Sequence, residues 1–417
     1  MEYAIIGNSA AAIGCVEGIR KIDKAGEIAI VSSEPHHTYA RPLISYLLQG
    51  KTTEEKMKYR LEGFYEENGC SLLAPRTAVS IDTAAKSVTL DGGEELRYNK
   101  LLVATGSTPF TPKMQGLENV SEDDKHFFMS LDDARKLASR ISKESKVLII
   151  GAGLIGLKCA EGIAGRVKSI NVVDLAPRIL SSILDAEGAS LIQERLEFNN
   201  IRFHLATSVQ SFESSNNKSA YGATLANGEE LGFDQLVLAV GVTPCVELAK
   251  KAGIEASRGI IINSKMQTSA PDVYAAGDNT MSFDVSSGQS KVLALLPNAY
   301  IQGECAGVNM AGGDASFENA IPMNAIGFFG QHVLTAGTYE GEVFVSSSKD
   351  CWKKLFVSDD VLKGFMIIGD PSRAGIYTNL VRERTSLSSI DFDLLREQPV
   401  LAAFAKPWRS ANLGGAH

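Results

Sequence analysis

The hydrophobic and polar positions of the chain follow the same pattern twice. Residues 3–6 form a short apolar run that ends at a glycine, and residues 147–150 form a second one. Each run leads into a stretch rich in small and apolar residues. A further apolar run then ends at an acid, Glu34 in the first copy and Asp174 in the second. The pattern predicts a buried strand, a helix and a second buried strand in both places.

The correspondence extends further along the chain. Residues 86–100 alternate around a glycine turn, and the apolar run 101–109 follows them. In the second copy, residues 223–235 alternate in the same way and lead into the run 236–244. Both stretches predict a β-hairpin followed by a buried strand. Two copies of so long a pattern indicate two dinucleotide-binding domains of the same design.

The rest of the chain predicts two further elements and a separate domain. An apolar strand at 273–276 ends at Gly277 and Asp278, and 295–310 is typical of a helix with Pro297 in its first turn. Beyond residue 318, runs at 342–345, 351–357 and 361–369 predict strands, and 373–384 predicts a helix. We therefore expect an α/β protein with two Rossmann-like domains and a C-terminal α+β domain. The expected boundaries are 1–112 and 242–317 for the first dinucleotide domain, 113–241 for the second and 318–417 for the cap.

The glycines of the second copy match a phosphate-binding turn. Gly151 suits a tight turn, Gly153 lets the backbone approach a pyrophosphate, and Gly156 lets the helix pack closely on the strand. The free N–H groups at the helix start then face the phosphates. Asp174 is placed to accept hydrogen bonds from both ribose hydroxyls, which favours NAD(H) over NADP(H).

The first copy has a degraded version of this turn. Gly7 is retained, but Ser9 and Ala12 stand at the second and third glycine positions. Small residues still admit a diphosphate, although a serine side chain crowds the closest backbone approach. The turn alone does not decide whether a cofactor binds here, but the internal repeat favours a cofactor site.

Size and charge limit the classes of protein. A chain of 417 residues is longer than one hydrophobic core usually supports, so several domains are expected. The net charge of −8 argues against nucleic acid as the main partner. No apolar segment approaches 18 residues and the N-terminus has no basic region, so we expect a cytoplasmic protein without a membrane partner.

Four motifs give the chain a family resemblance: 102–107, the turn at Gly151, 268–278 and 37–43. With these motifs it resembles the flavoproteins of the pyridine nucleotide–disulfide oxidoreductase superfamily. It is most similar to NADH:rubredoxin oxidoreductases and to the flavin portions of nitrite reductases. The resemblance implies that the first copy binds FAD, that the second binds NAD(H), and that chain after the second copy completes the FAD domain. Asp278 would then hold the ribityl chain, and the helix at 295–310 would point its start at the flavin.

The resemblance also implies the binding residues. For FAD they are Gly7, Ser9, Ala10, Ala11, Glu34, Arg41, Pro42, Val79, Ala104, Thr105, Gly106, Gly277, Asp278, Pro297 and Asn298. For NAD(H) they are Gly151, Gly153, Leu154, Ile155, Gly156, Asp174, Val240 and Gly241. No side-chain acid or base is needed for hydride transfer from NADH to flavin. Lys158, Glu161 and Arg41 are candidates for tuning the two cofactors.

The cysteines indicate how electrons leave the flavin. Disulfide reductases of the superfamily carry redox cysteines after the first acid, but 34–45 contains none. The six cysteines form no close pair, so no dithiol, zinc or iron–sulfur motif is encoded. Inert buried thiols are expected at Cys15, Cys159 and Cys305. We therefore expect direct transfer of single electrons to or from a metalloprotein: rubredoxin, a ferredoxin or an iron–sulfur subunit of a larger complex. The chain would act as a homodimer or within a hetero-oligomer.

Several alternatives stay open at this point. One is an oxidase, or a peroxide or persulfide reductase, that uses a thiol; another is a non-catalytic flavin sensor. Lys158 either pairs with Glu161 on its helix or faces the flavin, and Arg41 is either a surface residue or an FAD ligand. Loop roles are expected for His36 and His37. A partner-docking surface is expected at the cap and the loops near Arg41, with four candidate contacts: Trp352, Lys353, Lys354 and Trp408. Lys353 and Lys354 could instead lie on a solvated strand edge.

Overall fold

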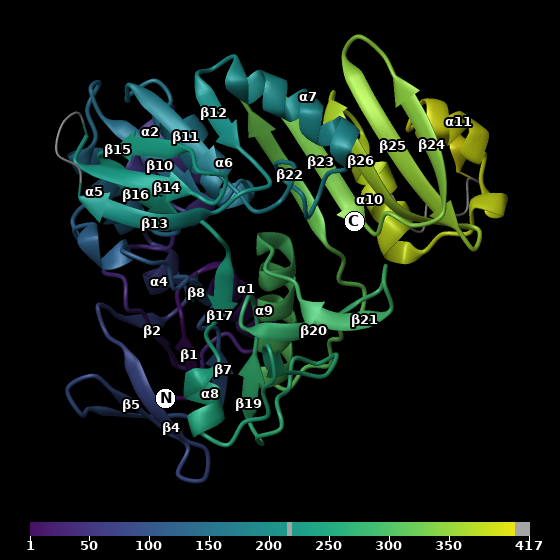
Figure 1. Cartoon of the computed structure of the whole chain (residues 1–417). Coiled ribbons are helices and arrows are strands. Elements are labelled where there is room, and N and C mark those ends of the chain that lie inside the picture. The colour runs from purple at the N-terminus through teal and green to yellow at the C-terminus, as the bar shows by residue number, and fades with distance from the viewer. Residues whose placement is uncertain (215–218, 405–417) are drawn as a thin grey trace. The chain divides into compact units, whose positions relative to one another are not determined.

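The computed structural model describes residues 1–214 and 219–404 (Figure 1). Its contacts divide the chain into two compact units. The first unit comprises Met1–Pro35, Tyr65–Gly106 and the chain from Pro244 onward; the second comprises His36–Phe64 and Ser107–Thr243. This division differs from the expected ranges, because residues 36–64, 107–112 and 242–243 group with the second unit and the C-terminal part groups with the first. Trp408 lies outside the described residues.

A parallel five-stranded sheet forms the centre of the first unit, in the order β19-β7-β1-β2-β3. Its strands are β1 (Tyr3–Ile6), β2 (Ile28–Val31), β3 (Cys70–Leu73), β7 (Lys100–Val103) and β19 (Val273–Ala275). Every residue of β1 and β2 is buried, as the unbroken apolar runs predict. Because β19 comes from chain after the second copy, that chain completes the sheet, as expected.

Two helices of this unit pack unusually closely through glycines. They are α1 (Ala10–Ile22) and α9 (Leu296–Met310). A Cβ atom on Gly14 would lie 2.3 Å from the carbonyl oxygen of Tyr300, and one on Gly303 would lie 1.9 Å from that of Ala11. Gly18 and Gly307 make similar approaches one turn further along. Backbone therefore touches backbone, and any side chain at these positions would push the helices apart.

The second unit repeats the plan of the first. Its parallel sheet has the order β12-β11-β10-β16-β9. The strands are β9 (Lys125–His126), β10 (Lys146–Ile150), β11 (Ser169–Val173), β12 (Ile201–His204) and β16 (Gln235–Leu238). Read from β9, the order is β9-β16-β10-β11-β12, and each strand has a counterpart at the same place in the first unit. The antiparallel sheet β4-β5-β6 likewise corresponds to β13-β14-β15. The internal repeat predicted from the sequence is confirmed.

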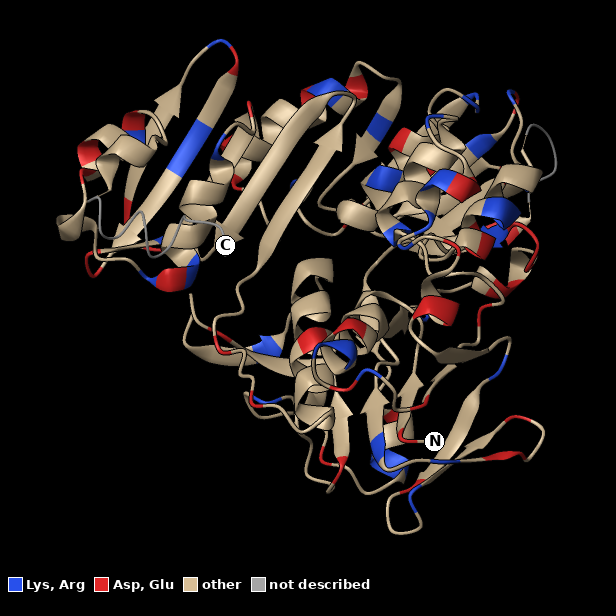
Figure 2. Cartoon of the chain, turned by 180° about the vertical axis from the view of Figure 1, so that it is seen from behind, with Lys and Arg blue, Asp and Glu red and all other residues tan. Residues whose placement is uncertain are grey.

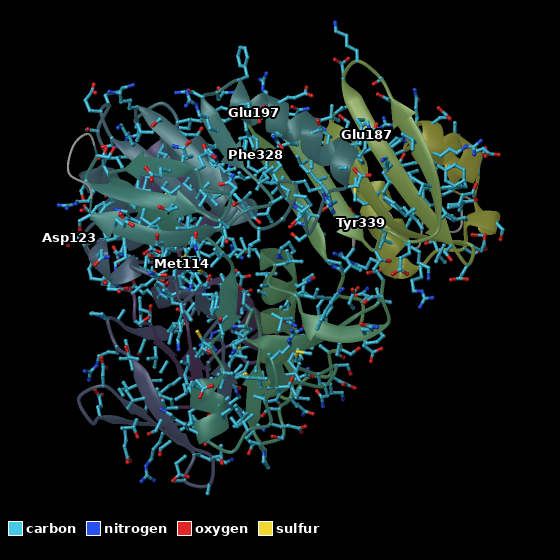
Figure 3. The ribbon with its side chains drawn as sticks, in the orientation of Figure 1. Met114, Asp123, Glu187, Glu197, Phe328 and Tyr339 are labelled. Atoms are coloured by element: carbon cyan, nitrogen blue, oxygen red, sulfur yellow. The ribbon has the colours of Figure 1, made fainter. Side chains whose placement is uncertain are left out.

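The remaining elements of the two units are short. In the first unit they are α4 (Phe64–Glu67), β4 (Ala78–Asp82), β5 (Ser87–Leu90), β6 (Glu95–Arg97), α8 (Glu247–Lys251), β18 (Ile260–Ile261), β20 (Thr280–Asp284) and β21 (Gln289–Val292). The second unit has α2 (Ile44–Leu48), α3 (Glu54–Met57), α5 (Leu131–Arg140), α6 (Leu154–Ile163), α7 (Ala186–Glu197), β13 (Val209–Ser214), β14 (Tyr221–Leu225) and β15 (Glu230–Phe233). Strands β8 (Ser107–Pro109) and β17 (Val242–Pro244) pair with each other. Met114 packs against the core that β13–β15 share with β10 and β16 (Figure 3).

A buried polar network crosses the sheet of the second unit. Asp124 accepts hydrogen bonds from Arg140, Tyr221 and the Nε2 amide group of Gln235. The Oε1 atom of Gln235 lies 2.7 Å from Nε2 of His126, which is 2% exposed. Since Gln235 donates toward Asp124, its oxygen faces His126 and accepts the Nε2 proton. Burial lowers the pKa of His126, so the ring is held neutral.

The C-terminal part forms an antiparallel sheet in the order β22-β23-β26-β25-β24. Its elements are β22 (Met323–Phe328), β23 (Gln331–Gly337), β24 (Glu342–Ser347), β25 (Cys351–Ser358), β26 (Val361–Gly369), α10 (Ala374–Glu383) and α11 (Phe392–Glu397). The three expected strands and the expected helix are confirmed; β22 and β23 were not anticipated. Residues of β23, β25 and β26 share a core with α10 and α11.

The expectation that Trp352 and Lys353 are surface contacts is wrong. Trp352 is 5% and Lys353 7% exposed, and β25 is an inner strand rather than an edge. The Nζ atom of Lys353 donates to the Arg396 carbonyl at the end of α11 (2.6 Å) and to the Tyr377 hydroxyl (3.2 Å). Burial lowers the pKa of Lys353. Lys354 is half-buried, with its Nζ 5.0 Å from the ring centre of Trp352.

Candidate functional site

The turn after β10 has the backbone geometry that a diphosphate requires. Gly151 has φ +111°, and a Cβ there would lie 2.3 Å from the carbonyl oxygen of Ala239. A Cβ on Gly156 would lie 2.0 Å from the carbonyl oxygen of Gly151, so helix and turn touch. Gly153, in contrast, has no atom within 4 Å of its Cβ position. The first and third glycines thus shape the turn, and the second leaves space open.

The helix start beside this space is uncapped. Gly153 is the N-cap residue of α6 and offers no side-chain acceptor. In the same unit, Ser130 caps α5 and Asp185 caps α7, each accepting a backbone N–H. The first N–H groups of a helix have no partners within the helix, and its N-terminus carries partial positive charge. The start of α6, which includes Leu154 and Ile155, therefore presents unused donors to an anion.

Asp174 lies at the same edge of the sheet and is held in place. Its Oδ2 atom accepts the Ala152 N–H at 2.6 Å and its Oδ1 atom accepts the Ala176 N–H at 2.7 Å. Val240 and Gly241 follow β16, which pairs with β10 in parallel, so they end at this edge too. Arg178 donates to the backbone carbonyls of Leu184 (3.0 Å) and Ser181 (3.4 Å). Its guanidinium is tied to its own loop.

The degraded first turn keeps the same shape. Gly7 has φ +118°, and a Cβ there would lie 2.1 Å from the carbonyl oxygen of Ala104. Ser9 is the N-cap residue of α1, but its side chain makes no capping hydrogen bond. The N–H groups at the start of α1, where Ala10 and Ala11 are buried, are therefore not consumed by the serine. The turn fits a diphosphate despite the lost glycines.

Three segments predicted to hold FAD converge in the first unit. Gly277 has φ +93°, and its Cβ position lies 3.4 Å from the Cβ of Ala11 on α1 and 3.7 Å from that of Ala299 on α9. The neighbouring Asn279 donates from Nδ2 to the carbonyl of Val103 (3.0 Å) and to the Thr105 hydroxyl (3.1 Å). The half-buried Asp278 thus stands between the first turn, the 104–106 segment and the start of α9.

A buried acceptor without a partner lies at the start of α9. Asn298 is fully buried; its Nδ2 donates to the Ile321 carbonyl at 3.1 Å, but its Oδ1 has no partner among the described residues. Pro297 precedes it in the first turn of the helix. An orphaned buried oxygen is costly unless a ligand or water donates to it. A flavin ring, which carries an N–H group, fits this requirement.

The other predicted FAD residues lie outside this convergence. Glu34 is half-buried beyond the end of β2, and Val79 is 48% exposed at a register shift of β4. Arg41 and the exposed Pro42 belong to the second unit. The Nη1 atom of Arg41 donates to the Tyr39 hydroxyl (3.2 Å) and to the Met129 carbonyl (3.3 Å). The FAD contact of Arg41 stays a prediction.

Lys158 and Glu161 form the ion pair that their spacing on α6 predicts. Glu161 is 4% exposed, and the Nζ atom of Lys158 lies 4.7 Å from the ring centre of Tyr46. The pair and the ring hold the ammonium group in place. Tuning of a cofactor by Lys158 stays a prediction.

All six cysteines are free thiols. Burial raises the pKa of Cys15 and Cys159 far above the ordinary thiol value, and that of Cys70 and Cys305 to about 11. The expected burial of Cys15, Cys159 and Cys305 is confirmed, and a protonated buried thiol is a poor nucleophile. The half-buried Cys245 lies beside the first cradle, where its carbonyl accepts the Thr105 hydroxyl at 2.8 Å. Among the described residues, no group of three or more His, Cys, Asp or Glu side chains is arranged to hold a metal.

Residues 1–303 match the family model described as pyridine nucleotide-disulphide oxidoreductase. The chain belongs to this family. It is an oxidoreductase, and the family uses FAD and NAD(H). Most of the residues predicted for each cofactor lie at the two turns described above, whereas Glu34, Arg41, Pro42 and Val79 lie outside them.

Similar proteins cover nearly the whole chain. It is 30% identical to the NADH-dependent phenylglyoxylate dehydrogenase subunit epsilon of Aromatoleum evansii, over 93% of each chain. It is 28% identical to the NADH-rubredoxin oxidoreductase of Clostridium acetobutylicum, over 89% of this chain and 91% of that one. The solved ferredoxin reductase for the CYP199A2 system from Rhodopseudomonas palustris is 25% identical, with a TM-score of 0.84 over 93% and 96% of the two chains. The chain spans about half the length of the nitrite reductases that it also matches.

Two features of the site were missed by sequence reasoning. The contact between α1 and α9 was signalled by glycines four residues apart in both helices, but a spacing within one helix does not reveal its partner. Gln302 and Asn279, which tie the Gly277 turn to its neighbours, are ordinary polar residues in the sequence; only their burial in an apolar stretch singles them out.

No helix in the described part of the chain is long and apolar enough to cross a bilayer.

Proposed function

We propose that the protein is an FAD-dependent NADH:acceptor oxidoreductase whose acceptor is a redox metalloprotein. One observation carries the proposal: the chain has two glycine turns that fit a diphosphate, each at a helix start without a side-chain cap, and none of its six thiols is paired with another. FAD, when bound, takes up two electrons from NADH and releases them one at a time. Without a thiol relay, the flavin exchanges electrons with the partner directly.

We assign one cofactor to each of the two turns. FAD is held in the first unit by the Gly7 turn, the start of α1, residues 104–106, Asp278 and the start of α9. NAD(H) is held in the second unit by the Gly151 turn, the start of α6, Asp174, Val240 and Gly241. Gly153 leaves the space that the pyrophosphate needs, and Asp174 is fixed to receive the ribose hydroxyls.

The names of the relatives support the class of partner. One relative is named as an oxidoreductase of rubredoxin, a solved structure is named as a ferredoxin reductase, and the phenylglyoxylate dehydrogenase relative is named as a subunit. We propose a rubredoxin, a ferredoxin or an iron–sulfur subunit as partner, with the chain acting as a homodimer or within a hetero-oligomer. Basic and acidic residues interleave along the chain (Figure 2), in keeping with a protein partner rather than nucleic acid. Six free thiols support a reducing, cytoplasmic location.

The test is anaerobic stopped-flow spectroscopy of the FAD-loaded protein. NADH should bleach the flavin rapidly, and oxidised rubredoxin or ferredoxin should restore its colour in one-electron steps. The matched variant is Cys245→Ser, which removes the thiol beside the first cradle and should leave both phases unchanged. Metal analysis of proteins that co-purify with the native chain would identify the partner.

Other outcomes would overturn the proposal in distinct ways. A flavin that NADH does not bleach would indicate a non-catalytic sensor. Rapid reoxidation by oxygen with no response to either iron protein would indicate an oxidase. Loss of turnover in Cys245→Ser would indicate a thiol-based reductase.

A further inference from the structure

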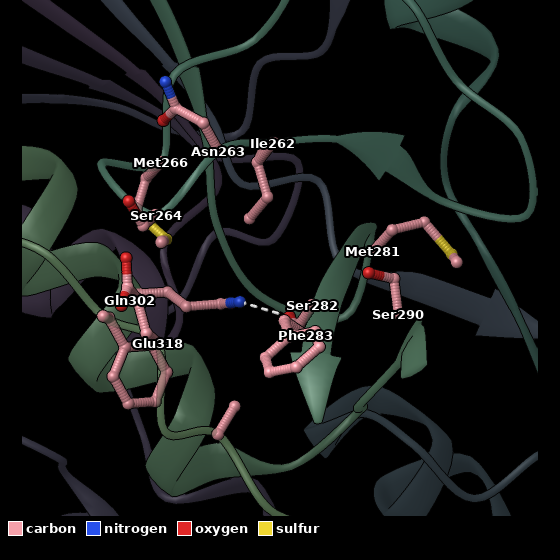
Figure 4. A pocket seen from close by; sticks show the side chains of 12 residues that line it. Ile262, Asn263, Ser264, Met266, Met281, Ser282, Phe283, Ser290, Gln302 and Glu318 are labelled. Atoms are coloured by element: carbon pink, nitrogen blue, oxygen red, sulfur yellow. Dashed lines mark hydrogen bonds between the residues drawn. The ribbon is translucent and has the colours of Figure 1, made fainter. Parts of the chain in front are cut away.

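Gln302 joins α9 to the turn that carries Asp278. It is 2% exposed, and its Oε1 atom accepts the Gly277 N–H at 2.8 Å and lies 3.4 Å from the Thr280 hydroxyl. Its Nε2 group donates to the Ser282 hydroxyl at 2.5 Å (Figure 4). One amide on α9 therefore contacts both the turn that follows β19 and strand β20, which comes after the turn.

The amide can make these contacts in only one orientation. The Gly277 N–H is a donor, so it requires the oxygen of Gln302 on its side, which leaves the NH₂ group for Ser282. Gly277 itself is in a left-handed conformation that offers its N–H to the helix rather than to the sheet. The direction in which Asp278 leaves the turn is thus set by a residue of α9.

We propose that Gln302 is a positioning residue for FAD, which fixes Asp278 relative to the start of α9. This inference rests on the proposed FAD site. The same helix carries Asn298, whose unpartnered oxygen lies one turn before Gln302. Loss of the amide releases the turn from the helix, so the two FAD-binding elements no longer share a fixed geometry.

The surroundings of Gln302 permit a clean substitution. Gln302 and Ser282 line a cavity of about 290 Å³ whose walls also include Met266, Met281 and Phe283. Gln302→Leu has a similar volume and places its methyl groups against these apolar walls, so the main loss is of hydrogen bonds. Ser282→Ala is the milder variant, because it removes the acceptor of the Nε2 group and keeps the bond to Gly277.

Asn309 provides the matched control on the same helix. It is 8% exposed, and its amide ties α9 to another loop through the carbonyls of Lys265 (3.1 Å) and Ala315 (2.9 Å). Asn309→Leu removes a buried amide of the same kind from α9, but at the end away from the Gly277 turn. A purely structural role of Gln302 predicts the same consequences for both variants.

The measurements are the FAD dissociation constant of the apoprotein, by fluorescence titration, and the Tm of the apoprotein. We expect Gln302→Leu to raise the dissociation constant at least tenfold and to shift the flavin absorption maximum. Ser282→Ala should give a smaller change in the same direction, and Asn309→Leu should lower Tm with a dissociation constant within twofold of wild type.

The results distinguish failure of the proposed function from failure of the positioning role. A wild-type protein that binds no FAD refutes the proposed function itself. FAD binding by Gln302→Leu within twofold of wild type refutes the positioning role alone, as does an equal loss in Asn309→Leu. If Gln302→Leu does not fold, Ser282→Ala decides, and an unchanged dissociation constant there overturns the inference.

Discussion

Asp174 should exclude NADPH, and replacing it should relax the choice of nucleotide. A 2′-phosphate carries about −1.5 to −2 charges near neutral pH. Two unit charges 4 Å apart interact by about 4 kcal/mol at an effective dielectric constant of 20. Because Asp174 is only half-buried, solvent screens part of this repulsion. We therefore expect about 2 kcal/mol, or roughly thirtyfold in kcat/KM, in favour of NADH.

The structure predicts a further gain for NADPH in Asp174→Ala. The carboxylate occupies the N–H groups of Ala152 and Ala176, which the substitution would release. Two free backbone donors would then face the position of the 2′-phosphate. The preference for NADH over NADPH should fall at least tenfold, partly through a higher KM for NADH.

The assay is steady-state reduction of ferricyanide with each nucleotide, measured for wild type, Asp174→Ala and Arg178→Ala. Arg178 is the control, because its guanidinium is bound to the Leu184 and Ser181 carbonyls and should not reach a phosphate. Equal efficiencies with NADH and NADPH in the wild type would refute the reasoning. So would an unchanged preference in Asp174→Ala, or a loss of NADPH activity in Arg178→Ala.

Three other changes have distinct expected outcomes. Gly153→Ala should leave Tm unchanged but raise the KM for NADH at least tenfold, whereas Gly156→Ala should also lower Tm, since overpacking costs about 1–3 kcal/mol; equal thermal melts would contradict this. Combined replacement of the buried Cys15, Cys159 and Cys305 by serine should leave kcat for NADH oxidation within about threefold of wild type. A triple variant that is folded but inactive would instead support a mechanism that uses a thiol. Because burial lowers the pKa of His126, its contribution to stability is fully present above about pH 6.5 and is lost as the pH falls toward the lowered value. In urea denaturation between pH 7.5 and 5.5, His126→Gln should reduce the decrease in the free energy of unfolding as the pH falls. The same substitution at the exposed His332 should leave that decrease unchanged.

Local patterns predicted the parallel sheets and both cradles well. Unbroken apolar runs, such as those that end at Gly7 and Gly151, signal strands buried on both faces. The roles assigned to Gly151, Gly153 and Gly156 follow from the turn itself, so no distant partner was needed to infer them. The β-hairpins could likewise be predicted from neighbouring residues alone.

Features that depend on contacts between distant segments could not be predicted from the local sequence. The alternation in β25 places Lys353 on the same face as Leu355, which is the covered face, but lysines on that face are rare enough that solvent seemed the better expectation. Its ammonium group is buried because the end of α11 supplies carbonyl acceptors, and α11 lies far along the chain. The roles of Gln302 and Asn279 likewise depend on which segments meet, rather than on their own neighbours in the sequence.

The order in which the strands occur along the chain bears on how the protein folds during synthesis. The second unit contains no residue beyond Thr243, whereas the first unit needs β19 and α9, which begin at Val273 and Leu296. Strand β1 and helix α1 leave the ribosome before the second unit, yet the glycine face of α1 has no partner until α9 has been made. Domains tend to fold as units while the chain emerges, and contacts between distant segments form slowly. We therefore expect the second unit to acquire its structure before the first, although the chain of the first unit begins earlier in the sequence, and we expect FAD to bind last.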